Sequence, residues 1–290
     1  MTASLAARLR RHVSHLAGEI GERHVLRPEA LHAAERYIAD TLRGLGYAVA
    51  RQNYEAQGVD CANLEATIAG GARGGEIVLA GAHYDTVPGS PGADDNASGV
   101  AAVLELARLL RDAQPARTVR LVAFVNEEPP FFFWGEMGSK VYARAARARG
   151  DDIRVMLSLE MLGCYSDEPG SQDYPPLLKH FYPKQGDYIA FVSNLRSRHA
   201  LRRAFDAFRA GCDFPAEKLA APALVPGVSW SDQLSFWREG YPAAMVTDTA
   251  FYRYRHYHQP TDTPEKLDYD RMAQVVEGLA RALQRLAAGD

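Results

Sequence analysis

Short apolar runs alternate along this chain with segments in which apolar residues recur every three or four positions. The run at residues 76–83 is apolar on both faces and lies between glycine-rich turns, which predicts a strand in the middle of a sheet. The alternation predicts an α/β fold, a three-layer sandwich whose largely parallel, mixed central sheet carries helices on both faces. Further strands are predicted at residues 47–54, 63–68, 118–126, 155–161, 188–193 and 243–248 and near Leu219, and helices at residues 31–45, 97–110, 139–149, 199–210 and 269–286.

A chain of 290 residues can form one large α/β domain or two small ones. Neither an internal repeat nor a linker divides the sequence, so a single catalytic domain over residues 1–290 is predicted. Apolar residues recur at helical spacing between positions 5 and 16, and residues 1–26 are therefore predicted to form an N-terminal helical extension. Residues 163–187 are rich in Tyr, Pro and Asp and predict a long loop, which inside a compact domain is usually functional or disordered.

The composition argues against several classes of protein. The net charge is -3 and no basic block is present, so no nucleic-acid partner is expected. No apolar run is long enough to span a membrane, and no membrane association is expected. The three cysteines, Cys61, Cys164 and Cys212, are odd in number and widely spaced, which favours reduced thiols and a cytoplasmic location. The oligomeric state is left open by the sequence.

Acidic and imidazole side chains gather in five segments, several of which follow the predicted strands. They are His83-Tyr84-Asp85, Asp94-Asp95-Asn96, Glu127-Glu128, Glu160 and His256-Tyr257-His258. Ligands of open α/β sheets bind beyond the carboxyl ends of the strands, so folding would bring these residues to one edge. Carboxylates and imidazoles without cysteine are the ligands of a hydrolytic zinc site rather than of a structural zinc finger. The pattern therefore predicts metal-assisted hydrolysis.

Spacing within two of these segments indicates individual roles. His83 and Asp85 are two residues apart and point to the same side of an extended chain. Asp85 could then accept a hydrogen bond from the imidazole nitrogen that faces away from a metal, or it could cap the turn that follows. One aspartate of the pair Asp94 and Asp95 could bridge two metals roughly 3.5–4 Å apart, whereas capping of the next helix is the favoured role of Asn96.

Pro129 and Pro130 prevent the predicted strand from continuing beyond Glu127 and Glu128. Because the two glutamates are adjacent, their side chains point in different directions as the chain leaves the strand. One glutamate can therefore bind a metal while its neighbour takes a proton from water. A solvated acidic pair is the alternative, and the apolar sequence on both sides argues against it. The aromatic run at residues 131–134 predicts either a wall of a substrate pocket or core packing.

Five motifs carry a resemblance to a known family. They are HYDT, GADDNASG, NEEP, SLEMLG and YHQPTDTPEKLDY, and they span roughly residues 27–286. In this order and spacing they resemble the dizinc aminopeptidases of peptidase family M28. The resemblance implies that His83 and Glu160 are ligands of one metal, Asp95 bridges the metals, Glu128 and His258 are ligands of the second metal, Glu127 is the general acid and base, and Asp85 orients His83. Many relatives carry Asp where this chain has Glu160.

The resemblance further implies two zinc ions per chain and a peptide substrate with a free N-terminus. The first alternative is an acyltransferase similar to glutaminyl cyclase, with the same fold and a single zinc, against which the complete ligand set argues. The second is a non-catalytic interaction domain on this fold. Alignment with the final motif favours His258 over His256 as the ligand, and Asp232 is a further candidate because residues 230–232 resemble a segment near the active site of relatives.

Overall fold

The protein was analysed as a computed structural model, which describes residues 3–132, 135–175 and 178–289. Within these residues one sheet of eight strands runs in the order β1-β2-β4-β3-β5-β8-β6-β7. The strands are β1 (Ala50–Ala56), β2 (Val59–Ile68), β3 (Arg73–His83), β4 (Arg117–Phe124), β5 (Asp152–Glu160), β6 (Ile189–Asn194), β7 (Ala216–Ala221) and β8 (Ala243–Thr247).

The middle of the sheet is parallel and its margins are mixed. Strands β4, β3, β5 and β8 run parallel to one another, so their carboxyl ends lie at one edge. Strands β2 and β6 run antiparallel to their neighbours β4 and β8, β1 forms a hairpin with β2, and β7 is parallel to β6. The final seven residues of β3, from Ile77 onward, are buried, as expected for a strand covered on both faces.

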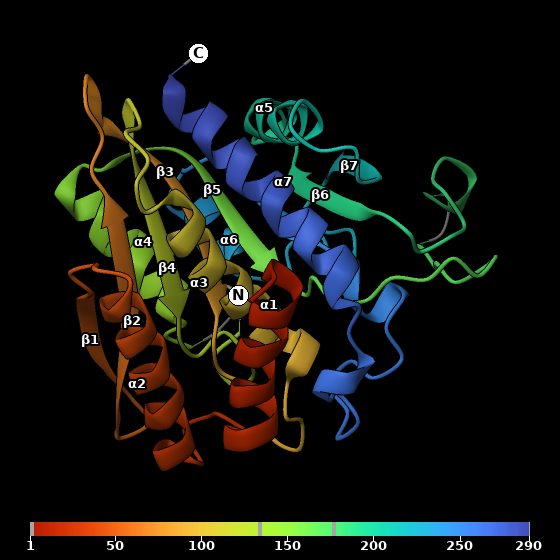
Figure 1. Ribbon diagram of the computed structural model, residues 1–290, viewed down its shortest axis with the longest axis horizontal. Helices are drawn as coiled ribbons and strands as arrows, with labels where there is room; N and C mark the ends of the chain where they lie inside the picture. The colour runs from red at the N-terminus through yellow and green to blue at the C-terminus, as the bar shows by residue number, and fades with distance from the viewer. Residues whose placement is uncertain (1–2, 133–134, 176–177, 290) are drawn as a thin grey trace.

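Helices form a layer on each face of the sheet (Figure 1). One face carries α1 (Leu5–Val13), α2 (Pro28–Gly44), α3 (Gly99–Leu110), α5 (Arg198–Arg209) and α7 (Tyr269–Ala288). The other face carries α4 (Gly138–Arg149) and α6 (Gln233–Arg238). The predicted three-layer α/β fold with a largely parallel, mixed sheet is therefore confirmed.

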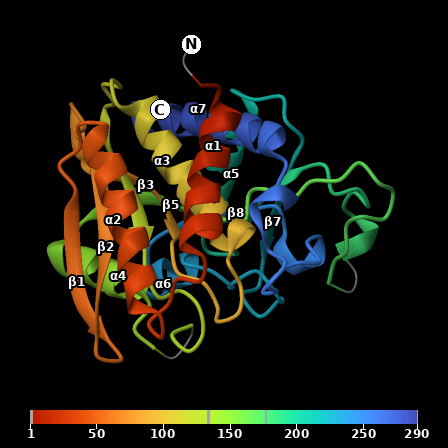
Figure 2. The same ribbon diagram turned by 60° about the horizontal axis from the view of Figure 1, so that its bottom comes forward.

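The N-terminal segment packs into the larger of the two cores. Leu5, Leu9 and Val13 of α1 are buried in one cluster with residues of α3 and α7, and α1 lies in front of the sheet with α3 between it and α2 (Figure 2). Arg8 donates a hydrogen bond to Glu105 of α3 at 2.8 Å, which adds an ion pair to the apolar contact. The predicted N-terminal helix is therefore built into the same layer as α2, α3, α5 and α7.

Two local features differ from the sequence predictions. The first hairpin turns at Gln57 and Gly58, both with positive φ, so β2 begins at Val59 instead of residue 63. Helix α6 is only six residues long, too short for its periodicity to be recognised in the sequence. Among the described residues no helix is both long and apolar enough to cross a membrane.

Candidate metal centre

The predicted metal ligands meet at the edge where the parallel strands end. His83 is the last residue of β3, Glu160 is the last residue of β5, and Glu128 follows β4. Asp95 lies in the helical turn η2 (Ala93–Ser98), which leads into α3, and His258 lies in the connection after β8. The fold therefore gathers residues that are up to 175 positions apart in the sequence, from 83 to 258.

The side chains form two groups of three that share Asp95. His83 Nε2 lies 3.3 Å from Asp95 Oδ1 and 3.4 Å from Glu160 Oε2. His258 Nε2 lies 3.1 Å from Asp95 Oδ2 and 3.4 Å from Glu128 Oε1. The two oxygens of Asp95 thus face different histidines, and in each group the ligand atoms lie within 4.8 Å of one another.

These distances fit tetrahedral zinc. With zinc–ligand bonds of about 2.0–2.1 Å, neighbouring ligand atoms of a tetrahedron lie about 3.3 Å apart. His258 Nε2 and Glu128 Oε1 are buried, and neither has a hydrogen-bond partner within the described parts of the chain. Each is therefore a buried polar atom without a partner, as expected where a bound metal ion would supply the missing contact. The donor set of imidazole and carboxylate is the one found in hydrolytic zinc sites.

The centre contains more negative than positive charge. Burial raises the pKa of Glu127 well above its usual range and that of Glu128 to about 8, and it also raises the pKa of Glu160. Burial alone would lower the pKa of the histidines, but the surrounding carboxylates have the larger, opposite effect. The pKa of His258 therefore rises to about 10. Buried carboxylates in such number require compensating cations, and bound metal ions would provide them.

Asp85 connects the ends of β3 and β4. Its Oδ1 accepts a hydrogen bond from the backbone N–H of Glu127 at 3.0 Å, and its Oδ2 accepts one from Glu128 at 3.1 Å. His83 Nδ1 lies farther away, 3.5 Å from Asp85 Oδ1. Asp85 therefore fixes the backbone of the glutamate pair and also lies behind the imidazole, a double position that the sequence analysis did not foresee.

Asp262 occupies an equivalent position on the other side of the centre. Its Oδ1 accepts a hydrogen bond from the backbone N–H of Asp94 at 2.9 Å, and its Oδ2 accepts one from Asp95 at 3.1 Å. The hydroxyl of Tyr254 also donates to Oδ1 at 2.8 Å. Burial raises the pKa of Asp262 to about 6. Sequence reasoning missed this residue, although it lies inside the YHQPTDTPEKLDY motif.

Arg23 ties the N-terminal segment to both sides of the centre. Its fully buried guanidinium donates hydrogen bonds to the backbone carbonyls of Leu16, Gly21, Tyr84, Pro91 and Gly92. Its backbone exchanges hydrogen bonds with Thr86, at 3.0 and 2.9 Å. Tyr84 separates His83 from Asp85, and Gly92 precedes η2, so Arg23 holds both loops that carry candidate ligands. A lone arginine gives no sequence signal for such a role.

The remaining candidates lie around Glu160 and in the last loop. Ser231 donates a hydrogen bond from Oγ to Glu160 Oε2. Its neighbour Asp232 is fully buried at the start of α6, and burial raises its pKa to about 7. His256 Nδ1 contacts Thr261 Oγ1 at 2.8 Å and belongs to neither group of three. The structure thus brings His258, and not His256, to Asp95.

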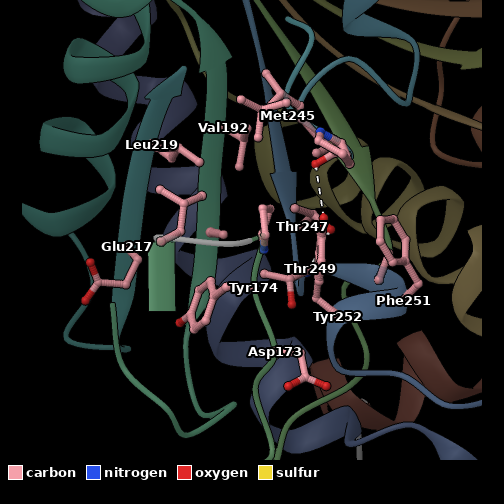
Figure 3. A pocket seen from close by; sticks show the side chains of 18 of the residues that line it. Asp173, Tyr174, Val192, Glu217, Leu219, Met245, Thr247, Thr249, Phe251 and Tyr252 are labelled. Atoms are coloured by element: carbon pink, nitrogen blue, oxygen red, sulfur yellow. Dashed lines mark hydrogen bonds between the residues drawn. The ribbon is translucent and has the colours of Figure 1, made fainter. Parts of the chain in front are cut away.

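Two cavities flank the centre on opposite sides along the sheet. The larger encloses about 840 Å³, open solvent included, reaches Glu160 and Tyr257, and extends over β8, β6 and β7 (Figure 3). The smaller encloses about 380 Å³ and reaches Asp85 and Glu128 at the β4 side. Phe131 lines the smaller cavity, whereas residues 133 and 134 of the aromatic run lie outside the described residues. The centre therefore has a cavity on each side.

Comparison with known proteins places this arrangement in a family. The sequence profile described as peptidase family M28 matches residues 63–283. The chain belongs to peptidase family M28. Over 284 residues the M28 chain is 39% identical to the uncharacterized protein YfbL of Escherichia coli (strain K12), covering 95% of this chain and 86% of that protein. It is also 28% identical over 229 residues to a probable leucine aminopeptidase of Trichophyton verrucosum, covering 73% of this chain and 54% of that protein.

Solved structures share the fold of this M28 protein. BSAP, a zinc aminopeptidase from Bacillus subtilis, superposes with a TM-score of 0.77 at 16% identity over 98% of this chain and 95% of that chain. A glutaminyl cyclase from Fimbriiglobus ruber superposes with a TM-score of 0.70 at 20% identity over 98% and 97% of the two chains. At these identities the likeness shows the fold alone. Family membership and the named relatives support a zinc-dependent peptidase.

Proposed function

We propose that this M28 protein is an aminopeptidase that uses two zinc ions to remove N-terminal residues from peptides. The observation that carries the proposal is the pair of ligand groups sharing Asp95, whose two oxygens lie 3.3 Å from His83 Nε2 and 3.1 Å from His258 Nε2. A carboxylate that faces two imidazoles in this way suits a bridge between two ions.

Each ion would have three protein ligands. His83, Asp95 and Glu160 would hold one ion, and Asp95, Glu128 and His258 would hold the other. Zinc ions in such a site act as Lewis acids toward a carbonyl oxygen and lower the pKa of water to about 7. Glu160 accepts hydrogen bonds from Ser231 and, at 3.4 Å, from Asn96, so the longer side chain at this ligand position is fixed by the protein.

Glu127 is the general base of the proposed reaction. Its carboxylate lies close to His83 and Glu128 in a third group of three. Glu127 belongs to neither of the two groups that share Asp95. Its backbone is held by Asp85 at 3.0 Å. Glu127 would accept a proton from the attacking water and later deliver it to the leaving amine. Burial raises its pKa, which helps a carboxylate to hold a proton between the two transfers.

The larger cavity would receive the side chain of the N-terminal residue. Val192 of β6, Leu219 of β7 and Met245 of β8 point into it from the sheet, and Tyr174 and Phe251 close its sides (Figure 3). This lining favours large apolar and aromatic side chains. The excess of carboxylates at the centre would favour the positive charge of a free α-amine.

A glutaminyl cyclase is the second candidate, because a cyclase shares the fold. A cyclase with a single zinc would leave one of the two ligand groups without a role. Metal analysis separates the two functions: two zinc ions per chain support the peptidase, whereas one ion together with pyroglutamate formed from N-terminal Gln supports the cyclase.

The test is a panel of aminoacyl anilides and short peptides with metal-stripped and zinc-restored protein. We expect hydrolysis only after metal is restored, faster turnover of Leu and Phe than of Gly or Asp, and no turnover of N-acetylated substrates. Glu127→Gln should retain metal and lose roughly 100-fold or more in kcat. A wild-type protein that binds no metal would instead support the non-catalytic interaction domain.

A further inference from the structure

We propose that the smaller cavity binds the residue that follows the cleaved bond and selects an apolar side chain there. This inference rests on the proposed aminopeptidase function. The two cavities reach opposite members of the ligand set, Glu160 in the larger and Glu128 in the smaller. A peptide whose first residue enters the larger cavity and whose first carbonyl reaches the centre therefore continues toward the smaller one.

The lining of the smaller cavity indicates which side chains it accepts. Half of its lining residues are apolar, namely Val25, Leu26 and Phe131 together with prolines at positions 88, 129 and 130. The other lining residues are polar: Asp85 and Glu128 belong to the candidate metal centre, and the rest are His24, Gln57, Thr86 and Asn126. Leu26 leaves 73% of its surface exposed. An exposed leucine beside an apolar cavity provides surface that an apolar ligand can cover.

The wall is fixed before any ligand arrives. Residues 24–26 directly follow Arg23, whose side chain donates five hydrogen bonds to backbone carbonyls. Glu22 Oε2 accepts a hydrogen bond from Gly89 N–H at 3.0 Å and lies 3.2 Å from His24 Nε2. The hydrogen bond from Gly89 holds the segment against the loop that follows β3, and the contact with His24 lies within the segment. A wall held in place in this way loses little conformational entropy on binding, so it can discriminate between side chains.

Size and charge restrict the occupant further. The cavity encloses about 380 Å³, open solvent included, which leaves room for a single side chain. Glu22, Asp85 and Glu128 give this side of the centre negative charge, part of which Arg27 offsets through its ion pair with Glu22 at 3.5 Å. An acidic residue after the cleaved bond should therefore be the poorest substrate, and Leu or Phe the best.

The experiment measures kcat/KM of zinc-loaded protein for peptides Leu-X-Ala with X = Leu, Gly, Lys or Asp. We expect X = Leu to exceed X = Gly by about tenfold or more, as hydrophobic pockets typically discriminate. Leu26→Asp should reduce this ratio severalfold and raise X = Lys relative to X = Leu. Leu195→Asp is the matched control, because Leu195 is 48% exposed and follows β6 at the opposite edge of the sheet. It should leave all ratios unchanged.

The outcomes separate this inference from the function on which it rests. If none of the four peptides is cleaved, both the inference and the proposed aminopeptidase function are overturned. Cleavage of all four at equal kcat/KM, or ratios that Leu26→Asp leaves unchanged, would overturn the inference while the aminopeptidase function stands. Because Leu26 is exposed, Leu26→Asp should fold, and its Tm should match that of Leu195→Asp.

Discussion

Asp85 and Asp262 perform the same task on two different loops. Each carboxylate accepts two consecutive backbone N–H groups, Asp85 from residues 127–128 at 3.0 and 3.1 Å, and Asp262 from residues 94–95 at 2.9 and 3.1 Å. The loops differ in what they carry: the first carries the proposed base and a ligand of one ion, and the second carries the proposed bridge. Although the two aspartates accept the same kind of hydrogen bonds, loss of those of Asp85 should mainly impair catalysis. Loss of those of Asp262 should mainly impair metal binding.

The largest effect is expected for Asp85→Asn. One carboxylate oxygen is replaced by an NH₂ group that cannot accept from a backbone N–H, so Glu127 or Glu128 loses its support. We expect kcat to fall roughly 100-fold, as for other groups that orient metal ligands. Steady-state kinetics at saturating zinc will measure it. A kcat within threefold of wild type would contradict the role assigned to Asp85.

Arg23→Met should weaken both sides at once, because Arg23 donates to carbonyls beside each loop. Buried carbonyls without a partner cost about 1–3 kcal/mol each, so the free energy of unfolding should fall by about 3 kcal/mol and zinc binding should weaken. Arg27→Met is the control, since the Arg27 side chain is 60% exposed. Urea unfolding and zinc titration of both variants test this. Equal stability of the two variants would refute it.

Asp262→Asn should act mainly on the metal. With one backbone N–H no longer accepted, Asp95 is less well held, and zinc affinity should fall about 10–100-fold. At saturating zinc, kcat should fall less than in Asp85→Asn. Competition with a chelator of known affinity measures the zinc affinity. If kcat falls as far as in Asp85→Asn, the distinction between the two loops is lost.

The pH dependence tests the charges between the two loops. In the metal-free protein the pKa of Glu128 rises from 4.5 to about 8 and that of His258 from 6.5 to about 10. The folded state thus binds more protons than the unfolded chain over this range, and the free energy of unfolding should fall as pH rises from about 5 to 8. Zinc must displace these protons, so its affinity should increase over the same range, by about tenfold per pH unit for each proton released.

Thermal unfolding of metal-free protein and calorimetric zinc titration in two buffers measure both trends. The stability trend should be much weaker in the zinc-loaded protein, in which the ligands are already deprotonated. A zinc affinity that is constant between pH 6 and 8 would show that Glu128 and His258 do not carry these protons.

The smallest effect is expected for Tyr254→Phe, which removes one of the three hydrogen bonds to the carboxylate of Asp262. One such bond contributes about 0.5–1.5 kcal/mol. Zinc affinity should therefore fall less than tenfold and kcat should hardly change. A larger loss than in Asp262→Asn would mean that Tyr254 acts elsewhere.

The same pair of aspartates shows how far the sequence predicts the site. Asp85 lies two residues from His83 on an extended segment, so alternation alone places both on one side. Asp262 is 167 residues from Asp95, and only the tertiary fold brings them together. The role of Arg23 is even harder to predict from the sequence, because its partners are backbone carbonyls, which every residue possesses. Residues that support a loop through its backbone leave no pattern in side-chain types.

In the fold, too, some features can be predicted from the sequence and others cannot. Strands such as β3 are buried on both faces and stand out as apolar runs, so their carboxyl ends were predictable. The order of the strands was not, because it depends on which strand each one pairs with. β8 lies between β5 and β6, and β6 runs antiparallel to it. No local periodicity distinguishes this arrangement from a simple sequential sheet.

The position of β8 also governs when the centre can come into being during synthesis. Chains leave the ribosome N-terminus first and begin to fold as they emerge. Four of the proposed ligands, at positions 83, 95, 128 and 160, emerge early, but the sheet cannot close between β5 and β6 until residues 243–247 appear. His258 follows later still. A nascent chain therefore cannot assemble the complete centre until His258 has emerged, because the group of Asp95, Glu128 and His258 lacks its histidine before then.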